Sequence, residues 1–388
     1  MLLRILTVLT LMFLTYCIAN AQSEEKGCIT TNILPTDSTS TTPAGGNRFI
    51  NSFKELFFKA VDWFNATDTA YILPNKYNLT LMLEQSTWFE HYRLGISGND
   101  GNQILGFAPK VNTKLGLYFG WRWTFLGYSF DLSSLLKKER EKSRTEMTFN
   151  LYSAKFGLDL FYRKSGNDFK ITSCKNFDLS DDYIGTNFSG FQSSIKGLNA
   201  YYIFKSKKYS YPAAYSQSTN QKKSCGSFMA GFAYSEHQIS FDRSKLPEEI
   251  QEQINPSSSF RKLNYTDYNI SFGYGYNWVF AKNCLLNISL LPAVGYKKAR
   301  INDMQTTDDY NWTEWVKDIN FDLITRAGIT WNNSKYYVGA TFILHTYDYR
   351  KDRISMTNSF GSLKIYAGFN FWKRKNSDFS VISERFVV

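Results

Sequence analysis

The stretch that decides the fold is DYNISFGYGYNWVFA, residues 267–281, because every second residue in it is large and apolar. Alternation with a period of two places the two kinds of residue on opposite faces of a β-strand. The large members are Tyr268, Ile270, Phe272, Tyr274, Tyr276, Trp278 and Phe280. Small and polar residues lie between them, so this strand separates an apolar environment from a polar one.

The same period recurs along most of the chain and predicts an all-β fold over residues 78–373. We expect about 12 antiparallel strands, within roughly 10–14. They are placed at 78–91, 112–121, 123–132, 146–163, 191–205, 209–216, 226–241, 267–281, 283–298, 317–331, 335–349 and 360–373. A soluble sandwich also alternates, but so many strands with bulky rings exceed one sandwich core. The pattern therefore predicts an up-and-down transmembrane β-barrel.

The connections between these strands alternate in length. Tight turns are expected at 121–123, 281–283 and 332–334, and long polar loops at 92–111, 133–145, 242–266 and 299–316. Short turns on one side and long loops on the other are typical of outer-membrane barrels. The alternation fails at 164–190, which is too long, and at 206–208, which is too short, so we expect a miscounted strand pair there.

The N-terminus resembles an export signal. Residues 1–21 combine Arg4, an apolar run over 5–16 and the ending Ala19-Asn20-Ala21, which predicts a cleaved signal peptide. The alternative, an uncleaved anchor helix, needs a longer apolar run to span roughly 30 Å of hydrocarbon. The remaining chain contains no run of about 18 apolar residues, so we expect it to cross a membrane only with strands.

Three further segments flank the expected barrel. Residues 22–47 are rich in Thr, Ser and Gly and predict a flexible polar tail. Residues 48–77 predict a short amphipathic helix, which either caps the barrel or lies on the membrane surface, and a segment leading into the first strand. Residues 374–388 are expected to form a C-terminal tail.

Composition narrows the class of partner. The chain has 17% aromatic residues and a formal net charge of +11. Aromatic side chains suit the boundary between water and lipid, and the basic cluster at 137–144 either meets anionic lipid headgroups or is a solvated loop. Outer-membrane lipids, including lipopolysaccharide, are therefore the expected partners. Basic residues interleaved with aromatic ones are missing, so we expect no nucleic-acid binding.

If the apolar register faces lipid, eight charged residues on the other register face the lumen. These are Glu84, Asp131, Lys155, Asp159, Arg163, Asp322, Arg326 and Lys364. Two interpretations stay open, a structural ion network that fills the lumen and a narrow aqueous pore.

Candidate enzymatic and metal chemistry is sparse. Among the three histidines, the closest pairing with a hydroxyl is His237 with Ser240, and a separation of three places them on opposite faces of a strand. His345 lies on the expected inward register. We therefore expect no enzyme, no cofactor and no metal site. An exported chain permits disulfides, and the strand count places Cys174 and Cys225 at one end of the barrel, which predicts a bridge between them, with unpaired thiols as the alternative.

Several motifs resemble a known family. The stretch Tyr209–Tyr215, followed by Gln221–Phe228, is similar to domain-of-unknown-function family 4421, exported proteins of Bacteroidota. Asp68–Ile72 and Lys155–Leu160 also resemble it, so the likeness covers most of residues 60–373. Pro212 and Cys225 depart from the family pattern, in which Arg and Ala are more frequent. The resemblance implies an outer-membrane barrel and supplies no active site.

Together these patterns predict a non-enzymatic outer-membrane barrel. It is expected to act as a channel for small solutes or lipids or as a structural envelope protein. Two alternatives stay open, a barrel-embedded lipid-modifying hydrolase or acyltransferase and a secreted soluble β protein that binds a partner.

Overall fold

The protein is described by a computed structural model that covers residues 66–98, 101–121, 124–131, 145–177, 183–254, 261–302, 319–351 and 354–373. The chain forms two compact units, Met1–Leu56 and Phe57–Val388, and the described residues all belong to the second. The predicted signal peptide, polar tail, amphipathic helix and C-terminal tail lie outside the described residues and stay predictions.

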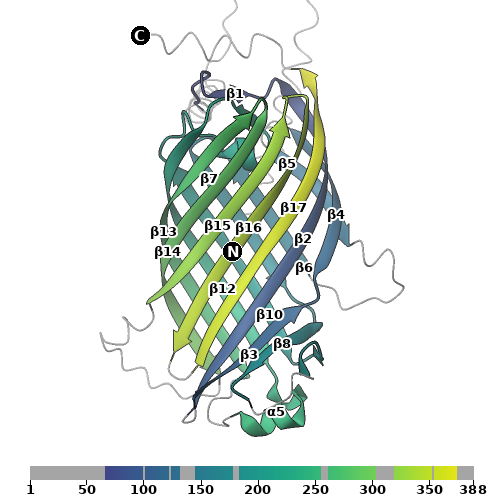
Figure 1. The fold of residues 1–388 in the computed structure, drawn as a ribbon, viewed down its shortest axis with the longest axis vertical. Coiled ribbons are helices and arrows are strands. Elements are labelled where there is room, and N and C mark those ends of the chain that lie inside the picture. The colour runs from purple at the N-terminus through teal and green to yellow at the C-terminus, as the bar shows by residue number, and fades with distance from the viewer. Residues whose placement is uncertain are drawn as a thin grey trace, which may run out of the picture. The chain divides into compact units, whose positions relative to one another are not determined.

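One antiparallel sheet of 15 strands dominates the described part of the chain. Twelve of these strands follow one another around a curled wall, and each is antiparallel to its neighbour (Figure 1). From one edge to the other they are β5 (Thr124–Asp131), β4 (Asn112–Trp121), β2 (Tyr77–Gly98), β17 (Ile354–Lys373), β16 (Tyr336–Lys351), β15 (Ile319–Asn332), β14 (Cys284–Asn302), β13 (Lys262–Ala281), β12 (Cys225–Phe241), β10 (Phe191–Ile203), β7 (Phe156–Lys164) and β6 (Thr145–Tyr152). The predicted all-β, antiparallel fold class is confirmed.

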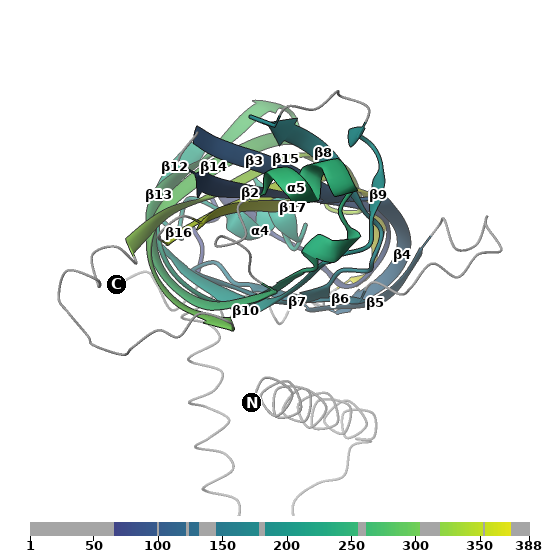
Figure 2. The same cartoon turned by 90° about the horizontal axis from the view of Figure 1, so that it is seen from below.

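The curl brings the two edge strands, β5 and β6, towards each other. Figure 2 shows the wall end-on, with strands around the interior. Lys114 on β4 places its Nζ atom 2.7 Å from Glu146 Oε2 on β6, so the ion pair crosses the space between the edges. The sheet is therefore barrel-like.

Three more strands branch from the wall at one end, which we call the loop end. The first half of β2 pairs with β4, whereas its last residues pair with β3 (Gly101–Pro109). Strand β3 then pairs with β8 (Phe169–Lys175), and β8 with β9 (Asn187–Phe188). The 3-10 turn η2 (Arg243–Lys245) and helix α5 (Glu248–Gln253) also lie at this end (Figure 1). The predicted loops 92–111 and 164–190 are wrong in part, because they contain this missed strand pair.

The opposite end, which we call the insert end, carries the tight turns. Residues 204–224 form an insert with helix α4 (Tyr211–Tyr215) and strand β11 (Thr219–Gln221), and β11 pairs with β1 (Ile72–Pro74). The predicted strand at 209–216 is wrong. Ser210 caps the helix by accepting a hydrogen bond from Ala213 N at 3.2 Å, and Pro212 suits the first turn, so local capping overrides the alternating tyrosines.

The predicted single strand at 146–163 is a hairpin, β6 and β7. Ser153 closes its turn, because its amide donates to Phe156 O at 2.8 Å and its hydroxyl accepts from Phe156 N at 2.9 Å. The alternation continues through this turn, which lacks Gly, Pro and Asn, so the sequence conceals it. The prediction counted one strand too few at 146–163 and one too many at 209–216. The two errors cancel, so the predicted number of 12 strands equals the number in the wall.

The predicted tight turns at 121–123, 281–283 and 332–334 are confirmed, since strands end and begin on either side of each. Asn283 and Ser334 adopt positive φ angles of 63° and 77°. Asparagine is among the residues that tolerate this left-handed conformation best, which explains the turn at 283 from local chemistry.

The outer face of the wall is apolar. Ile270 is 72% exposed and Phe321 75%, and neither packs against a second layer. Further exposed residues on this face are Leu83, Phe119, Phe204, Phe228, Phe232, Phe272, Tyr274, Trp278, Phe280, Leu290, Ile329, Val338, Ile365 and Trp372. The alternate residues of the same strands face inward and are buried and polar. Examples on β13 are Asn269, Ser271 and Asn277.

At the loop end the inner face of the sheet is apolar instead of polar. On β13, Leu263 and Tyr265 are buried inside, whereas Asp267 and Asn269 occupy the inward register two steps further on. An apolar core fills the loop end, made of Tyr92, Leu94, Ile96, Leu105, Phe107, Phe169, Ile171, Phe188, Phe191, Ile239, Phe241, Leu246, Ile250, Ile254, Leu263, Tyr265 and Met356. The sheet thus contains an aromatic core at one end and polar residues along the rest of its interior.

Candidate functional site inside the curled sheet

The interior collects most of the charged residues that the sequence placed in the lumen. Six of the eight lie on the inner face and form ion pairs there: Glu84, Asp159, Arg163, Asp322, Arg326 and Lys364. Asp131 pairs with Lys114 in the β4–β5 ladder, and its side chain lies outside the described residues. Lys155 lies in the turn between β6 and β7, so its predicted place in the lumen is wrong.

Arg326 on β15 organises the interior next to the insert. Its Nη2 atom lies 2.6 Å from Asp159 Oδ2 on β7, and its Nη1 donates to the Tyr211 hydroxyl of α4 at 2.7 Å. Tyr152 donates to the other oxygen of Asp159 at 2.7 Å. The Arg326 guanidinium also lies 5.1 Å from the ring centroid of Tyr201. This Arg326 network therefore joins opposite walls and the insert.

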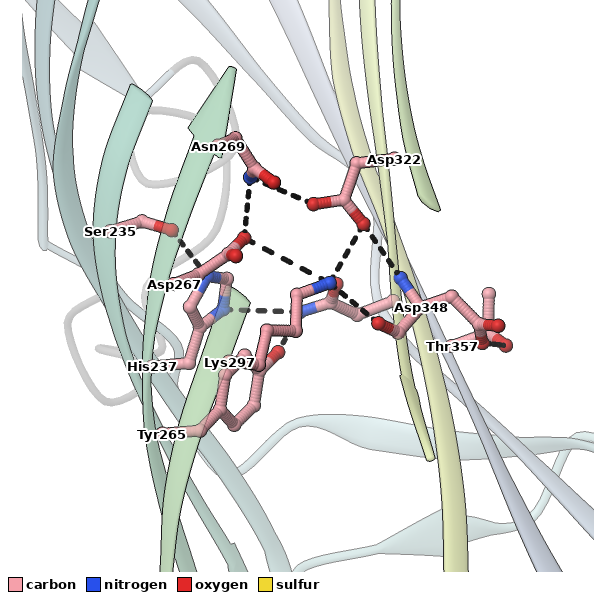
Figure 3. Close-up of polar contacts among 10 residues, drawn as sticks. Ser235, His237, Tyr265, Asp267, Asn269, Lys297, Asp322, Asp348 and Thr357 are labelled. Atoms are coloured by element: carbon pink, nitrogen blue, oxygen red, sulfur yellow. Dashed lines mark hydrogen bonds and ion pairs between the residues drawn. The ribbon is translucent and has the colours of Figure 1, made fainter. Parts of the chain in front are cut away.

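Lys297 on β14 forms a second network closer to the loop end, shown in Figure 3. Its side chain is fully buried, and Nζ lies 2.7 Å from Asp322 Oδ1 and 3.9 Å from Asp267 Oδ2. Nζ also donates to the carbonyl of Asp348 at 2.5 Å. Asn269 donates to both carboxylates, at 2.7 and 2.8 Å. One cation thus holds two carboxylates and the backbone of β16.

Arg163 on β7 lies between carboxylates and rings. Its guanidinium is 3.4 Å from Glu90 and 3.6 Å from Glu146, and none of its nitrogens reaches hydrogen-bond geometry with a described acceptor. It stacks 4.3 Å from the Trp88 ring centroid. On the neighbouring wall, Lys364 pairs with Glu84 at 3.2 Å. Buried cations on the inner face are therefore matched to carboxylates of other strands.

Two of the three histidines, His237 and His345, occupy the inner face as well, whereas His91 is exposed. His237 Nε2 lies 2.8 Å from Ser235 Oγ, two residues away on the same face of β12, while its ring stacks on Tyr265 at 4.3 Å. Both Ser235 and His237 are 2% exposed. His345 stacks on Phe360 at 4.9 Å. Ser240 is on the other face, as the spacing predicted, and the serine that contacts His237 is one that the sequence reasoning did not select.

The insert fills the interior at its own end, where α4 lies within the ring of strands (Figure 2). Gln221 is the central contact. Its Nε2 donates to the carbonyls of Lys208 and Lys223 at 2.7 and 2.9 Å, and its Oε1 accepts from Ser210 N at 2.8 Å and from Asn277 Nδ2 at 3.0 Å. The insert is thus attached to the wall by directional hydrogen bonds.

Other polar side chains of the insert meet the inner wall in the same way. Tyr215 donates to Asn287 Oδ1 at 2.5 Å, and Asn287 donates to the Tyr209 hydroxyl at 2.8 Å. Gln217 donates to the Tyr366 hydroxyl at 2.7 Å and accepts from Thr330 at 3.1 Å. These contacts span β14, β15 and β17, so the insert touches several sides of the wall.

Small cavities lie between the described groups of the interior. Two cavities inside the sheet each have a volume of about 10 Å³, one beside Tyr211 and Arg326 and the other beside Gln217 and Tyr337. A single water needs roughly 10–15 Å³. Neither cavity is lined by Ser235 or His237. Within the described residues, no group of three or more His, Cys, Asp and Glu is arranged to hold a metal ion.

The cysteines are at different ends. Cys174 on β8 packs against the loop-end core, whereas Cys225 begins β12 at the insert end and packs against Tyr209 and its neighbours. The predicted Cys174–Cys225 bridge is wrong, because the missed strands β3 and β8 reverse the end at which Cys174 lies.

Sequence reasoning missed Lys297 and Asp267, which are central to the second network. Both follow the inward parity of their strands, so the signal was present. The expected strands stopped at 298 and began at 267, which made these two residues look like loop-flanking charges.

The comparisons with known proteins agree with this geometry. The model of the family described as "Domain of unknown function (DUF4421)" matches residues 66–371. The chain belongs to this DUF4421 family. The match runs from the segment before β1 into β17 and confirms the family, whereas the attribution to exported proteins of Bacteroidota stays a prediction. The search of curated proteins found none that matches.

The chain is also similar to several solved structures. The outer-membrane protease OmpT of Escherichia coli is 8% identical, with 78% of this chain and 100% of that chain covered and a TM-score of 0.31. A FadL homologue of Pseudomonas aeruginosa is 9% identical, with 80% and 98% covered and a TM-score of 0.24. The toluene transporter TodX of Pseudomonas putida is 7% identical, with 76% and 91% covered and a TM-score of 0.20. Among the described residues of this DUF4421 chain, no helix has the length and apolar character needed to cross a membrane.

Proposed function

We propose that this DUF4421 protein is a bacterial outer-membrane β-barrel of twelve wall strands whose interior is sealed. It serves as a structural envelope protein that holds its loop end on one side of the membrane and its insert end on the other. The observation that carries the proposal is the combination of an apolar outer face with an interior filled by paired charges, the insert and the loop-end core.

The dimensions of the apolar outer face suit a bilayer. On β13 this face runs from Tyr268 to Phe280, which corresponds to about 40 Å along an extended strand. With a barrel-strand tilt of roughly 40°, this gives a band about 30 Å tall. Outer-membrane barrels present an apolar band of about 25 Å, so the match supports insertion over a water-soluble sandwich.

The sides of the membrane follow from the connections. The tight turns and the insert lie at one end, and the longer connections lie at the other. Barrels of this class have short periplasmic turns and longer extracellular loops. The insert end is therefore assigned to the periplasm and the loop end to the outside.

A sealed interior is favoured over an open solute channel. The Arg326 and Lys297 networks cross the lumen, and the insert contacts several walls. The cavities beside them, at about 10 Å³, hold at most roughly one water each. A continuous aqueous path would require these groups to separate.

Enzymatic function has weaker support. The Ser235–His237 hydrogen bond has the length of a nucleophile–base pair, but both side chains are buried and packed by Tyr265. A lipid ester has no route to the hydroxyl in this arrangement. We therefore assign the pair a structural role. The purified protein in mixed micelles should release no fatty acid, and release that disappears in His237→Ala would contradict this role.

The membrane assignment is tested by fractionation. The protein should stay in the membrane fraction after carbonate washing, dissolve in detergent and migrate differently on a denaturing gel before and after heating. Recovery in the soluble periplasmic fraction would refute the assignment.

The seal is tested separately in planar bilayers. Reconstituted protein should give no steady single-channel steps across the physiological voltage range. Reproducible steps that depend on correctly folded, heat-modifiable protein would replace the structural proposal with a channel.

A further inference from the structure

The insert end has an unbalanced charge. Its described segments carry ten lysines and one carboxylate, Asp68, whose Oδ1 already accepts a hydrogen bond from Ala70 N at 2.9 Å. The lysines are Lys76, Lys155, Lys205, Lys207, Lys208, Lys222, Lys223, Lys282, Lys335 and Lys373. The loop end is mixed, since Asp168, Asp242, Glu248, Glu249 and Glu252 lie among its basic residues. Only one end therefore presents a surface of a single sign.

The ten lysines divide into two sets by position. Six, which we call the rim lysines, lie where wall strands begin or end: Lys76, Lys155, Lys205, Lys282, Lys335 and Lys373. Four, the central lysines, belong to the insert: Lys207, Lys208, Lys222 and Lys223. The ammonium groups of Lys208 and Lys223 lie 5.0 and 5.4 Å from the ring centroid of Tyr71. Both side chains therefore contact a ring of the insert end.

Each rim lysine stands next to, or two residues from, an aromatic residue of the outward register. The pairs are Lys76 with Tyr77, Lys155 with Phe156, Lys205 with Phe204, Lys282 with Phe280, Lys335 with Tyr336, and Lys373 with Phe371. Lys335 Nζ lies 5.3 Å from the Tyr336 ring centroid. An aromatic residue followed by a cation recurs around the perimeter, which is the order found at a membrane boundary, with rings at the headgroup level and cations just beyond.

The aromatic side of this pattern is continuous on part of the outer face. Ring contacts run from Phe156 to Tyr202 at 5.0 Å, on to Phe204 at 5.2 Å and on to Phe272 at 6.4 Å. Phe272 in turn stacks on Phe228 at 5.5 Å. These ring contacts connect the aromatic residues beside Lys155 and Lys205 at the rim with the apolar outer face of β12 and β13.

The like charges at this end also influence one another. Lys155 has its pKa lowered by partial desolvation and, next, by the positive charge of Lys207. Among the rim and central lysines other than Lys155, none forms an ion pair with a carboxylate of the described residues. An external anion would relieve this repulsion.

We propose that the six rim lysines bind the phosphate groups of anionic phospholipids in the leaflet at the insert end. The inference rests on the proposed membrane insertion and adds a lipid class and a sidedness to it. Phospholipid is preferred to a soluble polyanion because the rim lysines follow the perimeter and its aromatic belt, whereas a polymer would meet the central lysines at the mouth. Lysine suits this ligand, since a point charge on a flexible stem can follow a mobile phosphate.

The test measures which lipids stay bound. The full protein is reconstituted in vesicles of equal phosphatidylcholine and phosphatidylglycerol, extracted gently, and examined by native mass spectrometry. The wild type should retain several-fold more phosphatidylglycerol than phosphatidylcholine. Changing all six rim lysines to Gln should bring this ratio close to one, because each neutral amide removes one electrostatic contact.

Two control variants make the result specific. One replaces six exposed lysines away from the insert end with Gln, namely Lys110, Lys164, Lys170, Lys175, Lys245 and Lys298, and so removes the same charge. The other replaces the four central lysines. Both should keep the wild-type ratio. Heat-modifiable migration of each variant shows that it is folded.

Several outcomes would overturn the inference. An unchanged ratio in the folded rim variant would do so, as would an equal loss in the charge-matched control. A third outcome is that only the central variant loses the lipid preference, and that this variant also fails to bind isolated peptidoglycan sacculi to which the wild type binds. That outcome would identify a cell-wall polymer as the ligand instead. Failure of the wild type to insert into vesicles at all would refute the proposed function itself.

Discussion

Two regions of the same strands use opposite arrangements of polar and apolar residues. Along the apolar band, β13 places Tyr268 and Ile270 outside and Asp267 and Asn269 inside. Towards the loop end, the same strand buries Leu263 inside. The second arrangement is that of a water-soluble β protein, and the first is its inverse. The change occurs within a few residues, and under the proposed membrane insertion its position would mark where the surrounding medium changes from lipid to water.

The comparison shows that the interior is held together differently in the two regions. The loop-end core packs rings such as Phe107, Phe188 and Phe191, at centroid distances of 5.1 and 5.2 Å. Such a core needs volume and apolar surface. The band interior depends on ion pairs and hydrogen bonds that need both partners in position. Substitutions should therefore have unlike effects in the two regions.

The largest effect is expected where a buried charge loses its partner. Arg326→Met removes the cation that faces Asp159 and the donor to the Tyr211 hydroxyl. An uncompensated buried carboxylate costs about 3–5 kcal/mol of unfolding free energy. Denaturant unfolding in detergent measures it, with Arg326→Met/Asp159→Asn as the control that should recover part of the loss. A loss below about 1 kcal/mol in the single variant would mean that water reaches Asp159, and the seal would be wrong.

The next effect tests the medium outside the band. Tyr274→Arg places a charge near the middle of the apolar outer face, where Tyr274 is 45% exposed. In a bilayer this costs about 2–4 kcal/mol, whereas on a water-exposed surface it costs within about 0.5 kcal/mol. Gln238→Arg is the matched control, because Gln238 is exposed on β12 towards the loop end. Refolding into vesicles gives both values, and equal values for the two variants would place the whole wall in water.

A smaller effect is expected at the attachment of the insert. Gln221→Met keeps the length of the side chain but leaves Ser210 N and the carbonyls of Lys208 and Lys223 without their amide partner. Unsatisfied buried groups cost about 1–3 kcal/mol. Hydrogen exchange should rise in residues 208–223 and stay unchanged in the loop-end core. Uniformly faster exchange would show instead that the insert and the core unfold as one unit.

The alternating pattern was sufficient to predict the class of fold, whereas the lipid medium that it indicates stays a prediction. Ile270 and Phe272 gave the strand, its outward face and the expectation of lipid, because the apolar residues follow one parity without a break. The same parity placed Asp159, Asp322 and Arg326 inside. Which of these residues form ion pairs could not be predicted from the sequence. The contact between Asp159 on β7 and Arg326 on β15 depends on how the sheet curls.

The errors have two physical causes. At Asp267 and Lys297 the polarity inverts while the strand continues, so a boundary drawn from apolar residues stops too early. In the insert, Tyr209, Tyr211 and Tyr215 alternate like a strand, but Ser210 and Pro212 favour a capped helical turn that the wall then encloses. In both cases the local sequence pattern and the three-dimensional surroundings favour different structures. A single sequence shows the local pattern but not the surroundings.

The smallest effect concerns the cysteines and follows from the missed strand pair. Because Cys174 packs at the loop end and Cys225 at the insert end, about 50 Å of extended β12 separates the two regions. Adding a reductant, or making Cys174→Ala/Cys225→Ala, should therefore change the unfolding free energy by less than about 1 kcal/mol, as expected for small substitutions without a cross-link. Peptide mapping under non-reducing conditions, after alkylation of the unfolded chain, should recover no peptide that links Cys174 to Cys225. A linked Cys174–Cys225 peptide would require the β3–β8 pairing to be abandoned, and with it the inverted core that distinguishes the loop end from the rest of the wall.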